Sequence, residues 1–185
     1  LEVYRDITES GDDVISIHIS SKLSGTCNSA VQAKERLGGN AKIEVVDSGL
    51  ASMGVGMAVL AGARAIKKGS DFNTVLQEVW KAVSESRIFF MVDTFEYLEK
   101  GGRIGKAQSF LGSLLNIKAI LTLSDGEIRP LERVRSRNKA LHRLGEIVED
   151  LAPISELCII DATTPADATC LVERLSHLVV PTEIV

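Results

Sequence analysis

The sequence predicts an α/β protein in which strands and helices alternate. The segment Val14–Ser20 alternates isoleucines with polar residues, as a half-buried strand does, and a helical pattern follows it. The run Ile88–Val92 is short and wholly apolar, which is typical of a strand buried on both faces. Apolar residues make up 45% of the 185 residues but aromatic residues only 4%, so the core must consist mainly of aliphatic side chains.

The first half of the chain is predicted to run strand, helix, strand, helix, helix. The elements that the periodicity predicts are, in order, a strand at Val14–Ser20, a helix at Thr26–Leu37, a strand at Ile43–Asp47 and a helix at Leu50–Lys68. Asp71 is placed to cap a further helix, in which Val75, Leu76, Val79 and Val83 recur at helical spacing. We place a domain boundary near Ser84–Ser86, which divides the chain into residues 1–85 and 86–185.

The second half contains a hairpin and then alternates helices with strands. Asp125-Gly126 separates Ile117–Leu123 from Glu127–Val134, and Asp-Gly is a strong signal for a tight turn. Pro130 lacks a backbone N–H and therefore indicates an edge strand or a bulge. The other predicted elements are a helical turn after Asp93-Thr94, helices at Ala107–Leu115, Asn138–Leu151 and Ala166–Leu178, and strands at Leu157–Asp161 and Thr182–Val185.

Composition excludes several classes of protein. A net charge of −4 gives no basic surplus for nucleic acid. The three cysteines form no C-x-x-C pair, and Cys158 lies in an apolar run that indicates a buried thiol, which suits a reducing cytoplasm. His18, His142 and His177 have no ligands at metal spacing, so we expect no metal. No apolar run reaches the roughly 18 residues needed to span a bilayer, and no signal peptide is visible, so we expect a cytoplasmic protein.

The first candidate site is the segment Ser20–Thr26, between the first strand and the first helix. Ligands of open α/β sheets bind at the carboxyl ends of strands, and a helix N-terminus favours an anion. Hydroxyl donors come from Ser20, Ser21, Ser24 and Thr26, while Gly25 lets a ligand approach the backbone. The chemistry suits a carboxylate or a single phosphate. The alternative is simple helix capping by Ser24 or Thr26.

Arginines form two further candidate sites. Arg103 follows two glycines and could lie against an anionic group, or pair with Glu96 or Glu99 as an ordinary loop ion pair. On a continuous strand, Arg133, Arg135 and Arg137 would share one face and seek an anionic partner. The alternative is a solvated strand face, with Glu127 and Glu132 as internal counter-charges.

Glycines in Ser48–Ala65 could be mistaken for a dinucleotide fingerprint. Gly54 and Gly56 come after the helix has started, however, and the third glycine is displaced. Close packing of the helix is the favoured explanation, with packing against a slim apolar ligand as the alternative. No Ser-His-Asp set can be assembled from the sequence, and we assign no catalytic residue.

Several of these motifs together resemble the DegV family of bacterial fatty-acid-binding proteins. The resemblance covers essentially the whole chain. The residues that carry it are I-H-I-S-S-K-L-S-G-T at Ile17–Thr26, V-V-D-S at Val45–Ser48, F-M-V-D-T-F-E-Y-L-E-K-G-G-R-I-G at Phe90–Gly105, L-N-I-K-A-I-L-T-L-S-D-G-E-I at Leu115–Ile128 and the R-V-R-S-R cluster at Arg133–Arg137.

The resemblance implies two α/β domains, an N-terminal Rossmann-like part with a parallel sheet and a C-terminal part with a mixed sheet and helices. One long-chain fatty acid would lie in an apolar tunnel between them, and no other cofactor is implied. The ligand's carboxylate would meet Ser21, with Ser20 and Ser24 close by. Family members present this carboxylate to a separate ATP-dependent fatty acid kinase subunit, which makes an acyl phosphate. Arg103 and one of the Arg133–Arg137 cluster would hold the head group or the kinase.

The chain departs from the family pattern at both ends. The family's T-S-Q-P-like and G-T-H-x-G-P-G-like segments are absent from it, so we expect a fragment that holds only part of the site. We expect a binding protein and not an enzyme. Two alternatives stay open: an enzyme acting on a small anionic substrate by phosphoryl or acyl transfer with Ser21 or Asp93, and a regulatory protein that docks an acidic partner on the arginine cluster.

Overall fold

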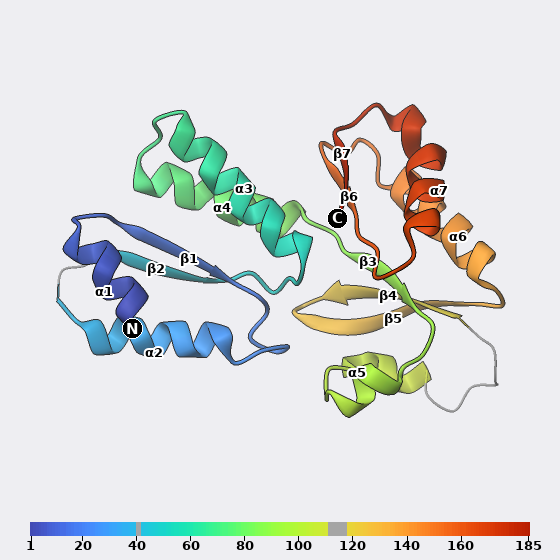
Figure 1. The fold of residues 1–185 in the computed structure, drawn as a ribbon, viewed down its shortest axis with the longest axis horizontal. Coiled ribbons are helices and arrows are strands. Elements are labelled where there is room, and N and C mark those ends of the chain that lie inside the picture. Colours follow the sequence, from blue (N-terminus) through green and yellow to red (C-terminus); the bar gives the residue numbers. More distant parts are fainter. Residues whose placement is uncertain (40–41, 111–117) are drawn as a thin grey trace. The chain divides into compact units, whose positions relative to one another are not determined.

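The computed structural model describes residues 1–39, 42–110 and 118–185 (Figure 1). The chain separates into two units. The first is Leu1–Ile88 together with Leu123–Arg129, and the second is Phe89–Thr122 together with Pro130–Val185. The boundary near Ser84–Ser86 stays a prediction. The end of the helix predicted at Ala107–Leu115 and the start of the strand predicted at Ile117 lie outside the described residues.

The first unit is built on two parallel strands, β1 (Val14–His18) and β2 (Ile43–Asp47). Their register places Ile17 beside Val46 and His18 beside Asp47. Because side chains alternate along a strand, Ser16 and His18 share one face of the sheet and the isoleucines lie on the other. The predicted alternation of β1 is thus confirmed, although the strand ends at His18 and not at Ser20.

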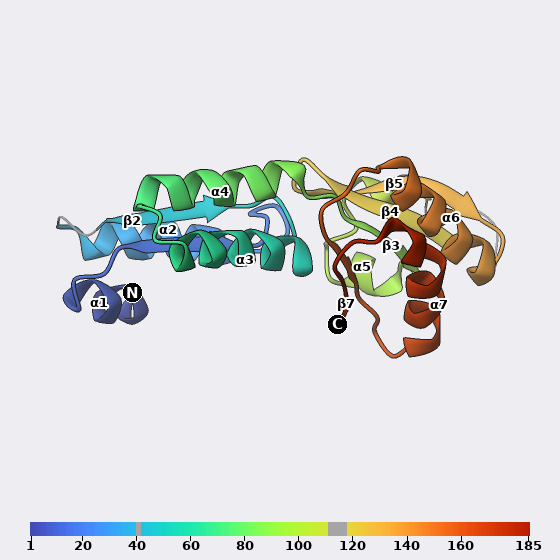
Figure 2. The same cartoon turned by 90° about the horizontal axis from the view of Figure 1, so that it is seen from above.

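Helices cover both faces of this sheet (Figures 1 and 2). On one face, α1 (Glu2–Glu9) and α2 (Thr26–Leu37) close a core that contains Tyr4, Val14, Ala30 and Ile43. On the other face, α3 (Met53–Lys67) and α4 (Phe72–Glu85) pack a core around Val46, Ala58 and Val79. The helix α1 was not predicted from the sequence, and its only buried residue is Tyr4.

Glycines in α3 permit close packing. A Cβ at Gly62 would lie 2.9 Å from Cγ2 of Val79 in α4, and one at Gly54 would lie 2.6 Å from Cδ1 of Ile88. Both glycines lie inside the helix and not in a loop before it, which agrees with the packing explanation. Asp71 caps α4 as predicted, since its Oδ1 accepts a 2.8 Å hydrogen bond from the N–H of Thr74.

A three-stranded sheet has the order β3 (Phe89–Val92), β4 (Lys118–Ser124), β5 (Glu127–Val134), with β3 antiparallel to β4. The turn between β4 and β5 consists of Asp125 and Gly126, whose φ angles are 53° and 76°. Both residues have the positive φ that a two-residue hairpin turn requires, so the predicted tight turn is confirmed. Pro130 lies in β5, which is an edge strand among the described residues.

The rest of the second unit consists of helices packed on strands. α6 (Arg137–Asp150) places Ala140, Leu144 and Ile147 against Ile120 of β4. α7 (Pro165–Leu175) packs on β6 (Leu157–Ile159), which pairs in parallel with β7 (Thr182–Ile184). The shorter elements are α5 (Glu96–Lys100) and two 3₁₀ helices, η1 (Gly105–Phe110) and η2 (Ser176–Leu178). The α/β fold class with parallel strands and a mixed pattern in the second half is confirmed.

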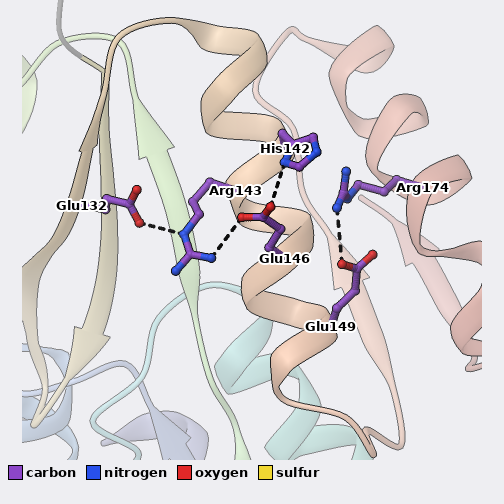
Figure 3. Close-up of polar contacts among 6 residues, drawn as sticks. All are labelled: Glu132, His142, Arg143, Glu146, Glu149 and Arg174. Carbon is purple, nitrogen blue, oxygen red and sulfur yellow. Dashed lines mark hydrogen bonds and ion pairs between the residues drawn. The ribbon is translucent and has the colours of Figure 1, made fainter.

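Ion pairs join α6 to β5 (Figure 3). The Nε of Arg143 donates to Glu132 at 2.7 Å, and its Nη1 donates to Glu146 at 3.0 Å. His142 lies 3.2 Å from Glu146, and its side chain is 61% exposed, so it lies on the surface of α6. Glu132 is therefore paired with Arg143 and not with the arginines at 133–137.

A glycine in α6 allows α7 to pack closely against that helix (Figure 3). Nη2 of Arg174 on α7 donates to Glu149 on α6 at 3.3 Å. A Cβ at Gly145 would lie 2.2 Å from Nε of Arg174, so only glycine leaves room for this side chain as it lies. The conformational cost of a mid-helix glycine is thus offset by the close approach of the two helices.

Candidate ligand-binding site

The candidate site is formed where β1 and β2 end, because the loops that follow them lie against each other. The N–H of Ser20 donates to the carbonyl of Leu50 at 2.8 Å. Ser48 is only 5% exposed, and its hydroxyl donates to the carbonyl of His18 at 2.6 Å. These bonds fix the loop at Ser20–Gly25, which we call the hydroxyl loop, against the loop that follows β2.

Ser20 is the buried anchor of the hydroxyl loop. It is 1% exposed, and its hydroxyl donates to the carbonyl oxygen of Gly126 at 2.7 Å. Oγ of Ser20 also accepts the N–H of Lys22 at 3.2 Å, and the Ser20 carbonyl accepts the N–H groups of Leu23 and Ser24 at 3.0 Å. Because its one hydroxyl proton is donated to Gly126, Ser20 shapes the loop. Direct contact of Ser20 with a ligand stays a prediction.

Ser21 is exposed and is held by Asp47. Oδ1 of Asp47 accepts the N–H of Ser21 and that of Gly49, each at 3.1 Å, and the Ser21 hydroxyl also bonds this carboxylate. Burial is the largest single influence on Asp47 and acts to raise its pKa, but the hydrogen bonds from Ser21 and Gly49 together lower that pKa below its ordinary value. Asp47 is therefore an ionised clamp between the two loops.

The start of α2 is open and carries spare hydroxyl donors. The N-cap is Gly25, and no side chain caps the helix, although Oγ of Ser24 accepts the N–H of Thr26 at 3.3 Å. In the described ranges, neither Ser24 nor Thr26 donates its hydroxyl proton to another residue. A Cβ at Gly25 would meet nothing within 4 Å. Capping therefore accounts for one long hydrogen bond, and the remaining donors suit an anion at this helix N-terminus.

A polar chain lies behind the hydroxyl loop, on the face of the sheet that α1 and α2 cover. The Tyr4 hydroxyl donates to Oγ of Ser16 at 2.6 Å, and Oγ of Ser16 lies 2.8 Å from Nε2 of His18. Cys27 of α2 is also buried, and burial, followed by the charge of Asp47, raises its thiol pKa. The polar face of β1 was predicted from the sequence, but the roles of Tyr4 and Asp47 were not. The contacts of Tyr4 with Ser16 and of Asp47 with Ser21 join separate parts of the chain, which local patterns do not reveal.

The arginine cluster differs from the prediction. Arg133 lies on β5, Arg135 lies in a bend, and Arg137 is the first residue of α6. The prediction of three arginines on one strand face was wrong, because the strand ends at Val134 and Ser136 caps the helix through the N–H of Lys139.

Each predicted arginine has its own surroundings in the second unit. Arg133 stacks over the Phe110 ring, 4.2 Å from its centroid, and donates to the carbonyl of Ser109 at 3.2 Å. Arg103 donates to the carbonyl of Gly101. Arg135 is exposed, and in the part of the chain that the structure describes it has no hydrogen bond or ion pair. That Arg103, Arg133 and Arg135 bind a ligand stays a prediction.

Arg137 is held by two aspartates. Its Nη1 lies 2.7 Å from Asp93 and its Nε 2.5 Å from Asp167, and Lys118 lies 2.8 Å from the other oxygen of Asp93. Hydrogen bonds from Lys118 and then from Arg137 lower the pKa of Asp93, with burial opposing them. This network links the end of β3 to β4, α6 and α7, and it leaves Arg137 little capacity for a further anion.

Within the described residues, no three His, Cys, Asp or Glu side chains are grouped so as to hold a metal ion. The described helices also include none that is long and apolar enough to cross a membrane.

Comparison with known proteins identifies the family. A family model described as "Uncharacterised protein, DegV family" matches residues 1–184. The chain belongs to the DegV family. A DegV domain-containing protein of Streptomyces coelicolor is 39% identical over 178 residues, which cover 94% of this chain and 62% of the relative. Four of the curated DegV relatives are covered over only 50% to 63% of their own length.

Solved DegV structures have the same fold. A fatty-acid-binding DegV family protein from Thermus thermophilus matches with a TM-score of 0.89 and 34% identity, over 99% of this chain and 67% of that one. DegV from Bacillus subtilis, a fatty acid binding protein, matches with a TM-score of 0.84 and 32% identity, over 99% of this chain and 67% of that one.

Proposed function

We propose that this DegV chain binds one long-chain fatty acid, with the carboxylate at the hydroxyl loop and the start of α2. The observation that carries the proposal is the combination of spare hydroxyl donors on Ser24 and Thr26 with an uncapped helix N-terminus, in a fold shared with fatty-acid-binding DegV proteins. Ser21, exposed at the outer end of the loop, is the third hydroxyl available to the head group.

Most of the affinity comes from the alkyl chain under this proposal. Burial of each CH₂ group contributes ~0.8 kcal/mol, so a tail of about 16 carbons supplies several kcal/mol after the cost of association is met. The head-group residues then need only satisfy one carboxylate. An apolar tunnel for the tail belongs to the proposal, and chain-length preference depends on its shape.

A second part of the proposal concerns reaction. We expect the bound carboxylate to be presented to a separate ATP-dependent fatty acid kinase, which forms the acyl phosphate, with Arg103, Arg133 and Arg135 contacting the head group or the kinase. Support comes from the exposure of Arg103 and Arg135. A cytoplasmic location suits this role, because ATP and the kinase are found there.

The alternative of an enzyme with Ser21 as nucleophile has less support. Ser21 bonds directly to Asp47, whose lowered pKa makes it a weak base for removing a hydroxyl proton. In this geometry Asp47 holds Ser21 in place and does not activate it.

Native mass spectrometry tests the binding proposal. We expect the purified chain, or the chain after delipidation and addition of oleate, to carry one fatty acid. A protein that purifies without lipid and gains no mass with oleate would contradict the proposal. The kinase role is tested separately by formation of acyl phosphate from ATP, which should require both the lipid-loaded chain and the kinase.

A further inference from the structure

We infer that Asp47 determines head-group specificity by selecting a singly charged carboxylate over a phosphate monoester. This inference rests on the proposed function, because it assigns a role to a residue beside the proposed head-group site. Ser21, Ser24 and Thr26 alone would accept either kind of anion, since hydroxyls and a helix N-terminus bind both.

Geometry places the charge of Asp47 at the head-group site. Its Oδ1 is 3.1 Å from the nitrogen of Ser21, and the same carboxylate bonds the Ser21 hydroxyl. An anion that contacts this hydroxyl therefore lies next to a second negative charge. Repulsion between like charges a few ångströms apart grows with the ligand's charge, so it disfavours a dianion more than a monoanion.

Other charged groups around the loop do not cancel Asp47. Lys22 is the loop's own cation, but its Nζ lies 3.5 Å from Glu127 at the hairpin tip. His18 on β1 is next to Asp47 in the strand register, with Nε2 2.8 Å from Ser16, and Cys27 on α2 carries a thiol of raised pKa. Lys22 and Glu127 together add no net charge, and the charge of His18 is the smallest of the influences on the pKa of Asp47, so Asp47 dominates the field at Ser21.

The Ser21 hydroxyl adds a second restriction. A hydroxyl has one proton to donate, and in this structure it bonds the Asp47 carboxylate, which can only accept. A ligand oxygen must compete with Asp47 for that proton. A carboxylate that takes this proton has Ser24 and Thr26 as further donors and needs no more, whereas the three oxygens of a phosphate need more donors than the loop provides.

The test compares two ligands with the same tail, oleate and oleyl phosphate, on the wild-type chain and on Asp47→Asn at pH 7.5. Asparagine keeps the oxygen that accepts the N–H groups of Ser21 and Gly49 but removes the charge. We expect the wild type to prefer oleate, and Asp47→Asn to reduce that preference about tenfold, mainly through tighter binding of the phosphate.

Asp13→Asn is the matched control, because Asp13 pairs with Lys42 at the opposite end of the same strands, 3.6 Å away. It removes the same charge and should leave the preference unchanged. An unchanged preference in folded Asp47→Asn would overturn the inference. A wild type that binds oleyl phosphate as tightly as oleate would also overturn it, and this result does not depend on the folding of Asp47→Asn. Absence of oleate binding to the wild type would instead contradict the proposed function.

Discussion

The hydroxyl of Ser20 donates a 2.7 Å hydrogen bond to the carbonyl of Gly126, a residue 106 positions further along the chain. This bond joins the tip of the β4–β5 hairpin to the loop after β1, and Ser20 is almost fully buried there. The shape of the hydroxyl loop therefore depends on a contact that neither segment contains by itself.

Gly126→Ala should destabilise the protein. A Cβ there would lie 2.6 Å from Oγ of Ser20, and the φ of 76° disfavours any L side chain. We expect a loss of about 2–3 kcal/mol in the free energy of unfolding, measured by urea denaturation. Gly69→Ala is the control: its φ is 81° but a Cβ would meet nothing within 4 Å, so it should cost only about 1 kcal/mol. Equal losses of stability in Gly126→Ala and Gly69→Ala would show that Ser20 does not clash with a side chain at position 126.

Ser20→Ala should also reduce stability, because it leaves the Gly126 carbonyl and the N–H of Lys22 without their partner. The expected loss is about 1–3 kcal/mol, the typical cost of an unsatisfied buried polar group. Ser24→Ala removes a partly exposed hydroxyl and should cost less than about 1 kcal/mol. Thermal unfolding followed by circular dichroism compares the two, and a larger loss in Ser24→Ala would contradict the anchoring role of Ser20.

Arg137→Gln should be more costly than Arg135→Gln. Arg137 pairs with Asp93 and Asp167, and its loss leaves the partly buried Asp167 without this ion pair. We expect a loss of about 1 kcal/mol for Arg137→Gln, because these side chains are only partly shielded from solvent. Arg135 is exposed and should change stability by less than about 0.5 kcal/mol. Equal effects in denaturant titrations would mean that the Asp93–Arg137–Asp167 network contributes nothing.

Asp47 should make stability depend on acid pH. Its pKa is lowered in the folded state, so its contribution is fully present above the ordinary carboxyl pKa of about 3.9 and is lost as the pH falls through the folded-state pKa. The free energy of unfolding of the wild type should exceed that of Asp47→Asn near neutral pH, and the difference should shrink below about pH 4. If the difference in unfolding free energy between the wild type and Asp47→Asn stays constant down to pH 2, the ionised Asp47 does not hold the two loops together.

Local signals predicted much of the fold. The turn at Asp125-Gly126 was predictable because both residue types accept positive φ. The start of α4 was predictable because the Asp71 side chain can cap a helix. The helix α1 was missed because it is only eight residues long and begins without a capping side chain, so no start signal marks it. The arginine cluster was misplaced because Ser136 ends the strand pattern by capping α6, a signal that competes with alternation.

The candidate site was predictable only in part. Ser20–Thr26 could be found from its position between a strand and a helix, but the different tasks of its hydroxyls could not. Ser20 is committed to Gly126 and Ser21 is held by Asp47, and both contacts depend on the parallel register of β1 with β2 and on the docking of a distant hairpin. Sequence patterns carry periodicity along the chain and do not specify such long-range pairs.

The central claim is that the hydroxyl loop holds the carboxylate of a fatty acid, and titration of delipidated protein with oleate tests it most directly. Ser21→Ala is compared with Ser29→Ala, which removes an exposed hydroxyl bonded to the Gly25 carbonyl on the first turn of α2. We predict that the wild type and Ser29→Ala bind one equivalent with the same affinity and that Ser21→Ala binds about tenfold more weakly, as expected for a lost hydrogen bond to a charged group. Equal affinity of all three proteins for oleate, or no binding by any of them, would contradict the claim.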